Sequence, residues 1–266
     1  MVVLSKRLQA LCDMVTPGNR VADVGCDHGF VSIYLVQKGI APYVYAMDVR
    51  EGPLQRAKEH IASYQMEAYI ETRLSDGVTA LLPGEADALV CAGMGGKLMQ
   101  KILTEGKDKV SGMKELILQP QSEIQAFRVF LRQEGFGIVE EKMICEEGKF
   151  YPMMRVVPGA GKLLDEAHPD DADRQLQQRL WDKFGRLLLE EKNPVLISFL
   201  HFNIKLHEEI LEKLRMQTGG DEAAVQGREN RIQEVLTEIE DMQRALLGME
   251  AGNDYSNIER GKETIS

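Results

Sequence analysis

Along roughly the first 160 residues, short continuous apolar runs alternate with segments whose apolar positions recur at helical spacing. The continuous runs, each bounded by glycine, proline or polar residues, predict buried strands; they are RVADV, YVYAMD, AYIETRL, DALVCAG and KELILQP. Between them, residues such as Phe30, Ile33 and Tyr34 share one face of a predicted helix that ends at Gly39. Strands separated by helices imply right-handed crossovers, and therefore a parallel sheet.

The end of this region follows a different pattern. Two extended runs, FGIVEEKMIC and FYPMMRVVP, are separated by the short glycine-containing segment EEGK. This arrangement predicts a β-hairpin, and thus an antiparallel pair that closes the sheet. The expected fold class is α/β, with a mostly parallel seven-stranded sheet of Rossmann-like type.

After Pro158 the composition shifts towards helix formers. One helical pattern covers residues 172–190, a second runs from about 195 to 216, and a third from about 222 to 249. The third has apolar residues at the spacing of a heptad seam, namely Ile232, Val235, Ile239, Met242 and Leu246. With the break TGGD between them, the last two helices are predicted to form an antiparallel coiled-coil hairpin.

The expected organisation is therefore a catalytic-type α/β domain over 1–160 and a helical, coiled-coil domain over 161–250. The segment 251–266 shows no periodicity and is expected to be a disordered tail. The hairpin has two open roles, bracing a partner or joining two copies of the chain, so both a monomer and a coiled-coil-mediated dimer are compatible with the sequence.

The charge distribution and the cysteine positions indicate which partners and which cellular compartment the protein can have. The net charge is −10, but residues 1–160 carry 18 Lys+Arg against 20 Asp+Glu, whereas residues 161–266 carry 14 against 22. The first domain thus remains able to present a basic face. No apolar run has the length of a membrane span or a signal-peptide core, and the four cysteines form no CxxC pair. We expect a cytoplasmic protein without a metal site, a disulfide framework or a membrane partner.

The segment Gly25-Cys26-Asp27-His28-Gly29 links a predicted strand to a predicted helix. Such a loop directs backbone N–H groups and a helix N-terminus at one point, which is typical of a ligand site. A dinucleotide site needs a glycine where this chain has Asp27, because a carboxylate would repel a pyrophosphate. S-adenosylmethionine has no phosphate and carries a sulfonium and an ammonium group, so an acidic loop favours it.

Two further acids follow the next two strands. Asp48 ends the second strand and is suited to accept hydrogen bonds from both ribose hydroxyls, and Asp76 in LSDG is suited to the adenine amine. Each acid also has a purely local interpretation that the sequence leaves open. Asp48 can cap the following helix, Asp76 can be a turn residue, and Asp23 can order the loop through its backbone. His28 can likewise be a helix-terminus cap without a ligand contact.

Five segments together resemble one family, the bacterial tRNA (adenine(22)-N1)-methyltransferases, or TrmK family. They are LSKRL, VADVGCDHGFVSIYL, AMDVREGPLQRA, LSDG and AGMGG. The resemblance implies a class I methyltransferase sheet followed by a helical, coiled-coil-like domain. It also implies that S-adenosylmethionine is the cofactor and that N1 of an unpaired adenine in tRNA is the acceptor.

The resemblance further implies roles for individual residues. The methionine end of the cofactor falls to Gly25, Asp27, His28 and Gly29, the ribose to Asp48, and the adenine to Asp76 and Gly77. The acceptor pocket falls to Ala92, Gly93, Met94, Gly95 and Gly96. Among these, Asp27, His28 and Met94 are the expected catalytic residues. The chain lacks the Asn- or Asp-Pro-Pro-Tyr motif of enzymes that methylate exocyclic amines, which agrees with attack by a ring nitrogen.

Contacts to RNA are the least specific part of this interpretation. Lys6, Arg7, Arg128 and Arg132 are candidates for phosphate contacts, and Tyr151 for stacking on a base. Each basic pair can equally be a solvated helix face, and Tyr151 a core residue. Two other functions stay open from sequence: methylation of another acceptor (small molecule, protein or DNA), and a non-catalytic nucleotide-binding module with a coiled-coil arm.

Overall fold

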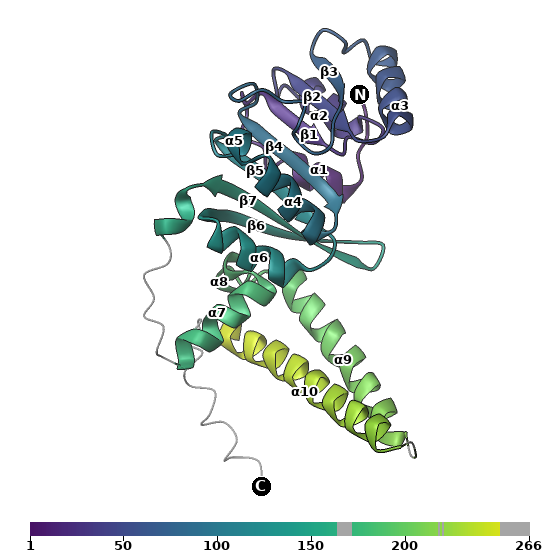
Figure 1. Cartoon of the computed structure of the whole chain (residues 1–266), viewed down its shortest axis with the longest axis vertical. Coiled ribbons are helices and arrows are strands. Elements are labelled where there is room, and N and C mark those ends of the chain that lie inside the picture. Colours follow the sequence, from purple (N-terminus) through teal and green to yellow (C-terminus); the bar gives the residue numbers. More distant parts are fainter. Residues whose placement is uncertain (164–171, 218, 220, 251–266) are drawn as a thin grey trace. The chain divides into compact units, whose positions relative to one another are not determined.

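The computed structural model describes residues 1–163, 172–217, 219 and 221–250, and the predicted tail 251–266 lies outside them. The chain divides into two compact units, Met1–Glu166 and Ala167–Ser266 (Figure 1). The boundary at 160 predicted from sequence stays a prediction.

One seven-stranded sheet forms the framework of the first unit, with strand order β3-β2-β1-β4-β5-β7-β6. Every pair from β3 to β5 is parallel, whereas β7 runs antiparallel to both β5 and β6. The predicted parallel sheet with an antiparallel hairpin at its end is therefore confirmed. The strands are β1 (Val21–Val24), β2 (Val44–Asp48), β3 (Ile70–Leu74), β4 (Ala88–Met94), β5 (Glu115–Pro120), β6 (Phe136–Glu146) and β7 (Lys149–Pro158).

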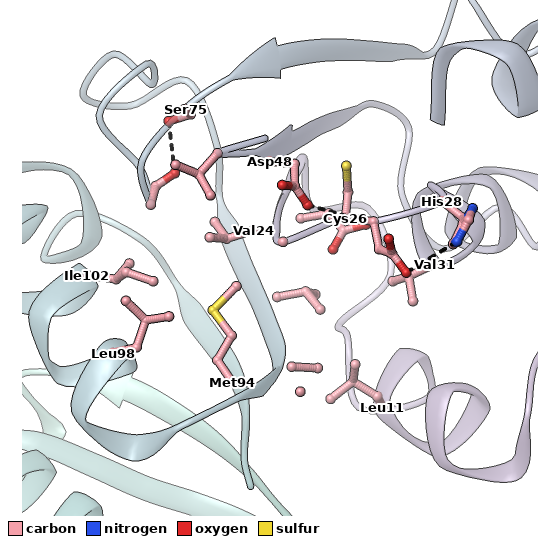
Figure 2. A pocket seen from close by; sticks show the side chains of 18 of the residues that line it. Leu11, Val24, Cys26, His28, Val31, Asp48, Ser75, Met94, Leu98 and Ile102 are labelled. Carbon is pink, nitrogen blue, oxygen red and sulfur yellow. Dashed lines mark hydrogen bonds and ion pairs between the residues drawn. The ribbon is translucent and has the colours of Figure 1, made fainter. Parts of the chain in front are cut away.

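The carboxyl ends of the parallel strands meet at one edge of the sheet, where ligands bind in open α/β folds. The loops that leave β1, β2, β3 and β4 surround a pocket at this edge, with Cys26, Asp48, Ser75 and Met94 around it (Figure 2). The order reverses between β1 and β4, so the chain leaves β1 and β4 in opposite directions and opens a crevice between their loops.

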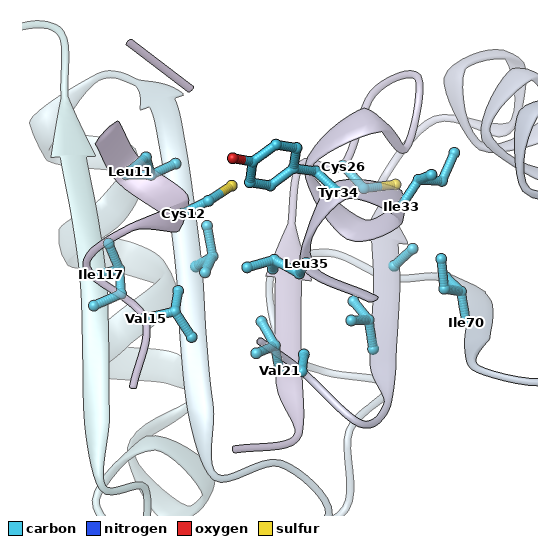
Figure 3. Packing of buried hydrophobic residues seen from close by; sticks show 14 of the residues in the cluster. Leu11, Cys12, Val15, Val21, Cys26, Ile33, Tyr34, Leu35, Ile70 and Ile117 are labelled. Carbon is cyan, nitrogen blue, oxygen red and sulfur yellow. The ribbon is translucent and has the colours of Figure 1, made fainter. Parts of the chain in front are cut away.

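Helices cover both faces of the sheet, and each face has its own apolar cluster. On one face, Leu11, Cys12 and Val15 from the N-terminal segment pack with Ile33 and Leu35 (Figure 3). The opposite cluster includes Met99, Leu103, Phe127 and Leu131. The helices are α1 (Lys6–Cys12), α2 (Phe30–Gln37), α3 (Glu51–Ser63), α4 (Gly96–Glu105), α5 (Lys107–Val110) and α6 (Ile124–Gln133), followed after β7 by the 3₁₀ turn η1 (Ala160–Leu163).

The second unit is helical, as predicted, but one helix of the prediction is wrong. The pattern over 172–190 forms two helices, because Gly185 adopts a backbone φ of 96° that no helix accommodates. In the α9–α10 pair, Nε2 of His207 lies 2.7 Å from Oε2 of Glu238. The helices are α7 (Ala172–Phe184), α8 (Arg186–Glu190), α9 (Pro194–Met216) and α10 (Glu222–Glu250).

A buried ion pair fixes α6 against β6. Nη2 of Arg128 lies 2.9 Å from Oε1 of Glu141, and the two side chains are only 4% and 1% exposed. Arg128 is therefore not available at the surface, and the expectation that it contacts phosphate is wrong. The sequence could not reveal this, because an arginine one helical turn from Arg132 has the same spacing on a solvated face as on a buried one.

Removing one member of this pair should destabilise the protein. Arg128→Met removes the cation that lies 2.9 Å from the buried Glu141 carboxylate, and we expect a loss of about 3–5 kcal/mol in the free energy of unfolding. The double substitution Arg128→Met/Glu141→Leu should recover most of this loss, because it removes the buried carboxylate together with the guanidinium. Urea unfolding measures both, with the exposed Arg56→Met as a control that should change stability by less than about 0.5 kcal/mol. A single variant as stable as the control would contradict the assignment.

Candidate active site

The glycine loop after β1 adopts an unusual backbone conformation. Gly25, Asp27 and Gly29 all have positive φ angles, of 76°, 48° and 74°. The amides of Gly25 and Cys26 both donate to the carbonyl oxygen of Met47 at the end of β2, at 2.8 and 2.9 Å. Asp27 is held in a conformation that a non-glycine residue rarely adopts, and such residues cluster at functional sites.

Gly29 serves the packing of the helices behind the loop. A Cβ atom at this position would lie 3.2 Å from Cβ of Ala57, so α2 begins in close contact with α3. Gly29 does not line the pocket. Its close contact with Ala57 supports the ligand loop from behind, and its predicted contact with the cofactor stays a prediction.

Most of the predicted site residues converge on one pocket with a volume of about 580 Å³ (Figure 2). This volume is within the range of small-molecule sites. The predicted residues that line it are Arg7, Gly25, Asp27, His28, Asp48, Asp76, Gly77, Ala92, Gly93 and Met94. The parallel strand order thus brings together residues as far apart in the sequence as Gly25 and Met94, as expected.

Two carboxylates lie deep in the pocket. Asp48 is 6% exposed and accepts hydrogen bonds from the backbone amides of Arg50, at 2.9 Å, and of Asp27, at 3.3 Å. It therefore joins the loop after β1 to the start of α3, and its position at the carboxyl end of β2 leaves it on the pocket wall. Asp48 thus orders the segment that leads into α3, which is the local role that the sequence left open, and it also lines the pocket.

Asp23 is the second deep carboxylate. It is only 4% exposed and is the penultimate residue of β1, just before the loop. The pKa of Asp23 is raised to about 6, mainly by burial and also by the neighbouring charge of Asp48, although a hydrogen bond from Ser32 Oγ at 2.6 Å lowers it. Around neutral pH this group is ionised but insufficiently solvated. A cationic ligand nearby would relieve that deficit.

The other two acids are at the solvent-facing side of the pocket. Asp27 is 59% exposed, and its Oδ2 lies 3.6 Å from Nε2 of His28. Asp76 is 54% exposed and lies 3.2 Å from Nζ of Lys101, on α4. Four carboxylates therefore line one small pocket, a set that suits a positively charged ligand and disfavours a diphosphate.

The acceptor-side residues are arranged by a bulge in β4. The register against β5 shifts between Ala92 and Met94, and Gly93, with a φ of 76°, is the extra residue. Met94 lies over the glycine loop, because a Cβ added to Gly25 would clash with Cε of Met94. The bulge thus aims the Met94 side chain into the pocket while strand pairing continues around it.

Several predicted residues lie outside the pocket. Gly95 and Gly96 pack under the loop after β5, where a Cβ on Gly96 would be 2.7 Å from the carbonyl oxygen of Ser122. Tyr151 on β7 stacks under the guanidinium of Arg7, with Cζ 5.0 Å from the ring centroid. Lys6 is exposed at the start of α1, and Arg132 is half-buried on α6.

Other lining residues had no signal in the sequence. Leu8 and Leu11 come from α1, Val49 from the start of the loop after β2, Leu98 and Ile102 from α4, and Gln121 from the loop after β5. Val49 and Leu98 are large apolar residues left 60% and 43% exposed. Apolar positions that line a pocket but remain exposed are typical of surfaces that a planar ligand covers.

Thiol chemistry and metal chemistry find no support in the described residues. Cys26 lines the pocket, but burial raises the pKa of its thiol and three nearby aspartates raise it further, so it stays protonated. Within residues 1–163, 172–217, 219 and 221–250, no cluster of three or more His, Cys, Asp and Glu side chains is placed to hold a metal ion. No helix in these same ranges is long and apolar enough to cross a membrane.

Comparison with known proteins identifies the class of the first unit and the family of the whole chain. The family profile described as "Methyltransferase domain" matches residues 4–154, so the first unit is a methyltransferase domain. The curated tRNA (adenine(22)-N(1))-methyltransferase of Bacillus subtilis (strain 168) is 32% identical over 195 residues, which cover 73% of this chain and 79% of that protein. The chain belongs to this family of tRNA (adenine(22)-N(1))-methyltransferases.

Two solved structures of tRNA methyltransferases are similar to this chain over most of its length. The crystal structure of the B. subtilis M1A22 tRNA methyltransferase TrmK has 27% sequence identity and a TM-score of 0.76, covering 92% of this chain and 99% of that chain. Sp1610 of Streptococcus pneumoniae, in complex with S-adenosyl-L-methionine, has 28% identity and a TM-score of 0.74, covering 92% of this chain and 100% of that chain.

The buried carboxylate of Asp23 generates a prediction about stability. Its pKa in the folded state, about 6, is above that of the free side chain, so the folded protein loses stability as the pH rises from about 4 to 6. Asp23→Asn keeps an acceptor for Ser32 and removes this loss. We therefore expect the variant to melt at a higher temperature than the parent at pH 7.5, with a difference that shrinks as the pH is lowered towards 4.

The same substitution should weaken binding of a cationic ligand. At pH 7.5 we expect Asp23→Asn to bind S-adenosylmethionine on the order of tenfold more weakly, about 1.4 kcal/mol. Affinity of the parent protein should also fall as the pH drops below 6, because Asp23 is then protonated. Calorimetric titrations at several pH values measure this. Equal affinity of the two proteins at pH 7.5 would show that Asp23 does not sense the charge of the ligand.

Proposed function

We propose that this chain transfers a methyl group from S-adenosylmethionine to N1 of adenine 22 in tRNA. Family membership supports the reaction, and the complex of Sp1610 with S-adenosyl-L-methionine supports the cofactor. The single observation that carries the proposal is the pocket itself. Four carboxylates line it, and one of them, Asp27, is the middle residue of the glycine loop. The cytoplasm, where tRNA is processed, is the expected location.

The residues present fit the cofactor part by part. Asp48 is suited to the ribose hydroxyls, and Asp76 and Gly77 to the adenine, with Leu98 and Ile102 as apolar walls. Gly25, Asp27 and His28 are suited to the methionine end, where Asp23 lies beneath the loop. When bound, the cofactor supplies a methyl group on a positively charged sulfur. The acids of the pocket stabilise that charge and the ammonium group.

Positioning and electrostatics carry the proposed catalysis, because N1 of adenine has a free lone pair at neutral pH and needs no base. Ala92, Gly93 and Met94 form the acceptor side, and the missing side chain of Gly93 lets a base approach. Met94 offers an adaptable apolar surface against the base. Asp27, exposed and next to His28, is placed to stabilise the positive charge that the methylated base acquires.

Recognition of RNA requires that the target adenine be unpaired, which costs a few kcal/mol when it must be extruded. Lys6, Arg7, Arg132 and Tyr151 remain the proposed contacts of the first unit. The helical unit over 161–250 is proposed to brace the folded tRNA or to join two copies of the chain. Its coiled-coil character is part of this proposal.

Incubation with unmodified bulk tRNA and labelled S-adenosylmethionine, followed by nucleoside analysis, tests the proposed function. We expect the label in 1-methyladenosine, and loss of labelling when adenine 22 of a transcript is replaced by guanine. Label only in a different nucleoside would overturn the assigned acceptor atom. Absence of label together with normal cofactor binding would point to an acceptor other than tRNA.

Asp48→Ala should weaken binding of S-adenosylhomocysteine severely, by more than tenfold, because the ribose hydroxyls lose their acceptor and the loop amide of Asp27 loses its partner. Asp48→Asn retains one acceptor oxygen and should have an intermediate effect. Isothermal titration measures both, and a melting curve without ligand reports whether the fold is intact. An affinity within threefold of the parent, about 0.7 kcal/mol, would disprove the ribose role.

A further inference from the structure

Arg7 extends from α1 into the wall of the pocket, although it precedes the sheet in the sequence. Leu8 and Leu11 of the same helix line the pocket beside it. Nη1 of Arg7 lies 3.8 Å from the position that a Cβ on Gly93 would occupy, and Nε2 of Gln121 lies 3.6 Å from the same point. The guanidinium is therefore beside the bulge of β4.

Neutral groups hold this guanidinium in one position. Nη1 donates to Oε1 of Gln119 at 2.7 Å, and the ring of Tyr151 lies 5.0 Å from Cζ. Gln119 is completely buried, and its Nε2 donates to the carbonyl oxygen of Pro120 at 3.1 Å, so its amide is fixed at both ends. A half-buried arginine oriented by a fully buried amide has lost much of its rotamer freedom before any ligand arrives.

The charge of Arg7 has no carboxylate partner in the part of the chain that the structure describes. Arg50, the other arginine of the pocket lining, lies 3.9 Å from Asp48, whereas the contacts of Arg7 are the Gln119 oxygen and the Tyr151 ring. Arginine has five N–H donors in a planar fork, and Gln119 occupies one of them. A fixed cation with unused donors in a pocket is a receptor for an oxyanion.

We infer that Arg7 is a positioning residue that binds an oxyanion of the reactants through its free N–H groups. Its place beside Gly93 and Gln121 favours the phosphate group of the nucleotide that presents its base to Met94. This choice of source rests on the proposed function. The carboxylate of the cofactor has the same chemistry, and the experiment distinguishes the two sources.

The test compares Arg7→Gln and Arg7→Lys with the parent protein. Melting temperatures without ligand first establish that each variant is folded. Titrations with S-adenosylhomocysteine and with 5′-methylthioadenosine, which lacks the amino-acid part, report on the cofactor. Steady-state methylation of unmodified tRNA reports kcat and KM, and tRNA binding at several salt concentrations reports the number of phosphate contacts.

For a phosphate, we expect Arg7→Gln to raise the KM for tRNA by about 10- to 100-fold and to reduce the salt dependence of tRNA binding by about one contact. Affinity for S-adenosylhomocysteine should not change. Arg7→Lys keeps the charge and should restore the salt dependence but only part of the KM, because an ammonium lacks the planar fork. For a cofactor carboxylate, Arg7→Gln should instead weaken S-adenosylhomocysteine and leave 5′-methylthioadenosine unaffected.

Matched controls separate this role from general charge and from packing. Arg56→Gln removes an exposed cation that neither lines the pocket nor is a proposed RNA contact, and it should keep a KM for tRNA close to that of the parent. Gln119→Glu places a carboxylate of nearly the same shape as the amide against the guanidinium, and should reproduce the effect of Arg7→Gln.

If folded Arg7→Gln retains parental cofactor affinity, KM and salt dependence, the inference is wrong. A parent protein without activity would instead refute the proposed function.

Discussion

The site depends on one set of backbone hydrogen bonds between neighbouring parallel strands. The amides of Gly25 and Cys26 share the carbonyl oxygen of Met47, and the amide of Asp27 donates to the carboxylate of Asp48. Together they pin the left-handed loop after β1 to the end of β2. Because Asp48 also accepts from Arg50, the same carboxylate orders the entry to α3. The ligand loop, the predicted ribose acceptor and two helices thus form one mechanical unit.

This unit concentrates negative charge in a place that the fold must desolvate. Asp23 and Asp48 are both buried at adjacent strand ends, and their mutual repulsion adds to the effect of burial on Asp23. A pocket of this kind is costly without a ligand and is stabilised by a cation that binds only the folded state. Natural proteins tolerate such local strain at functional sites because the surrounding structure over-determines the conformation. Here the pinned loop and the Ser32 hydrogen bond provide that constraint.

The sequence predicts what is periodic or local, and fails where tertiary packing decides. The alternation of strands and helices and the EEGK turn predict the whole sheet. The acids after the first three strands, Asp27, Asp48 and Asp76, predict the position of the pocket. The helix α1 is only seven residues long, too short for its periodicity to be read. Arg128 and Gly185 were misjudged for related reasons: burial of an arginine depends on a partner, Glu141, in a distant strand, and a single glycine can end a helix or continue it.

The pocket has two sides of different origin, one with carboxylates and one with an arginine that has no carboxylate partner among the described residues. The loops after β1, β2 and β3 contribute the carboxylates, whereas the bulge of β4, the loop after β5 and α1 contribute Gly93, Gln121 and Arg7. A guanidinium in contact with one of these carboxylates would form an ion pair, and its charge would be neutralised. Gln119 and Tyr151 prevent this, since both hold the guanidinium without neutralising it. In the proposed reaction, the carboxylates serve the positively charged methyl donor, and Arg7 serves an oxyanion of the reactants.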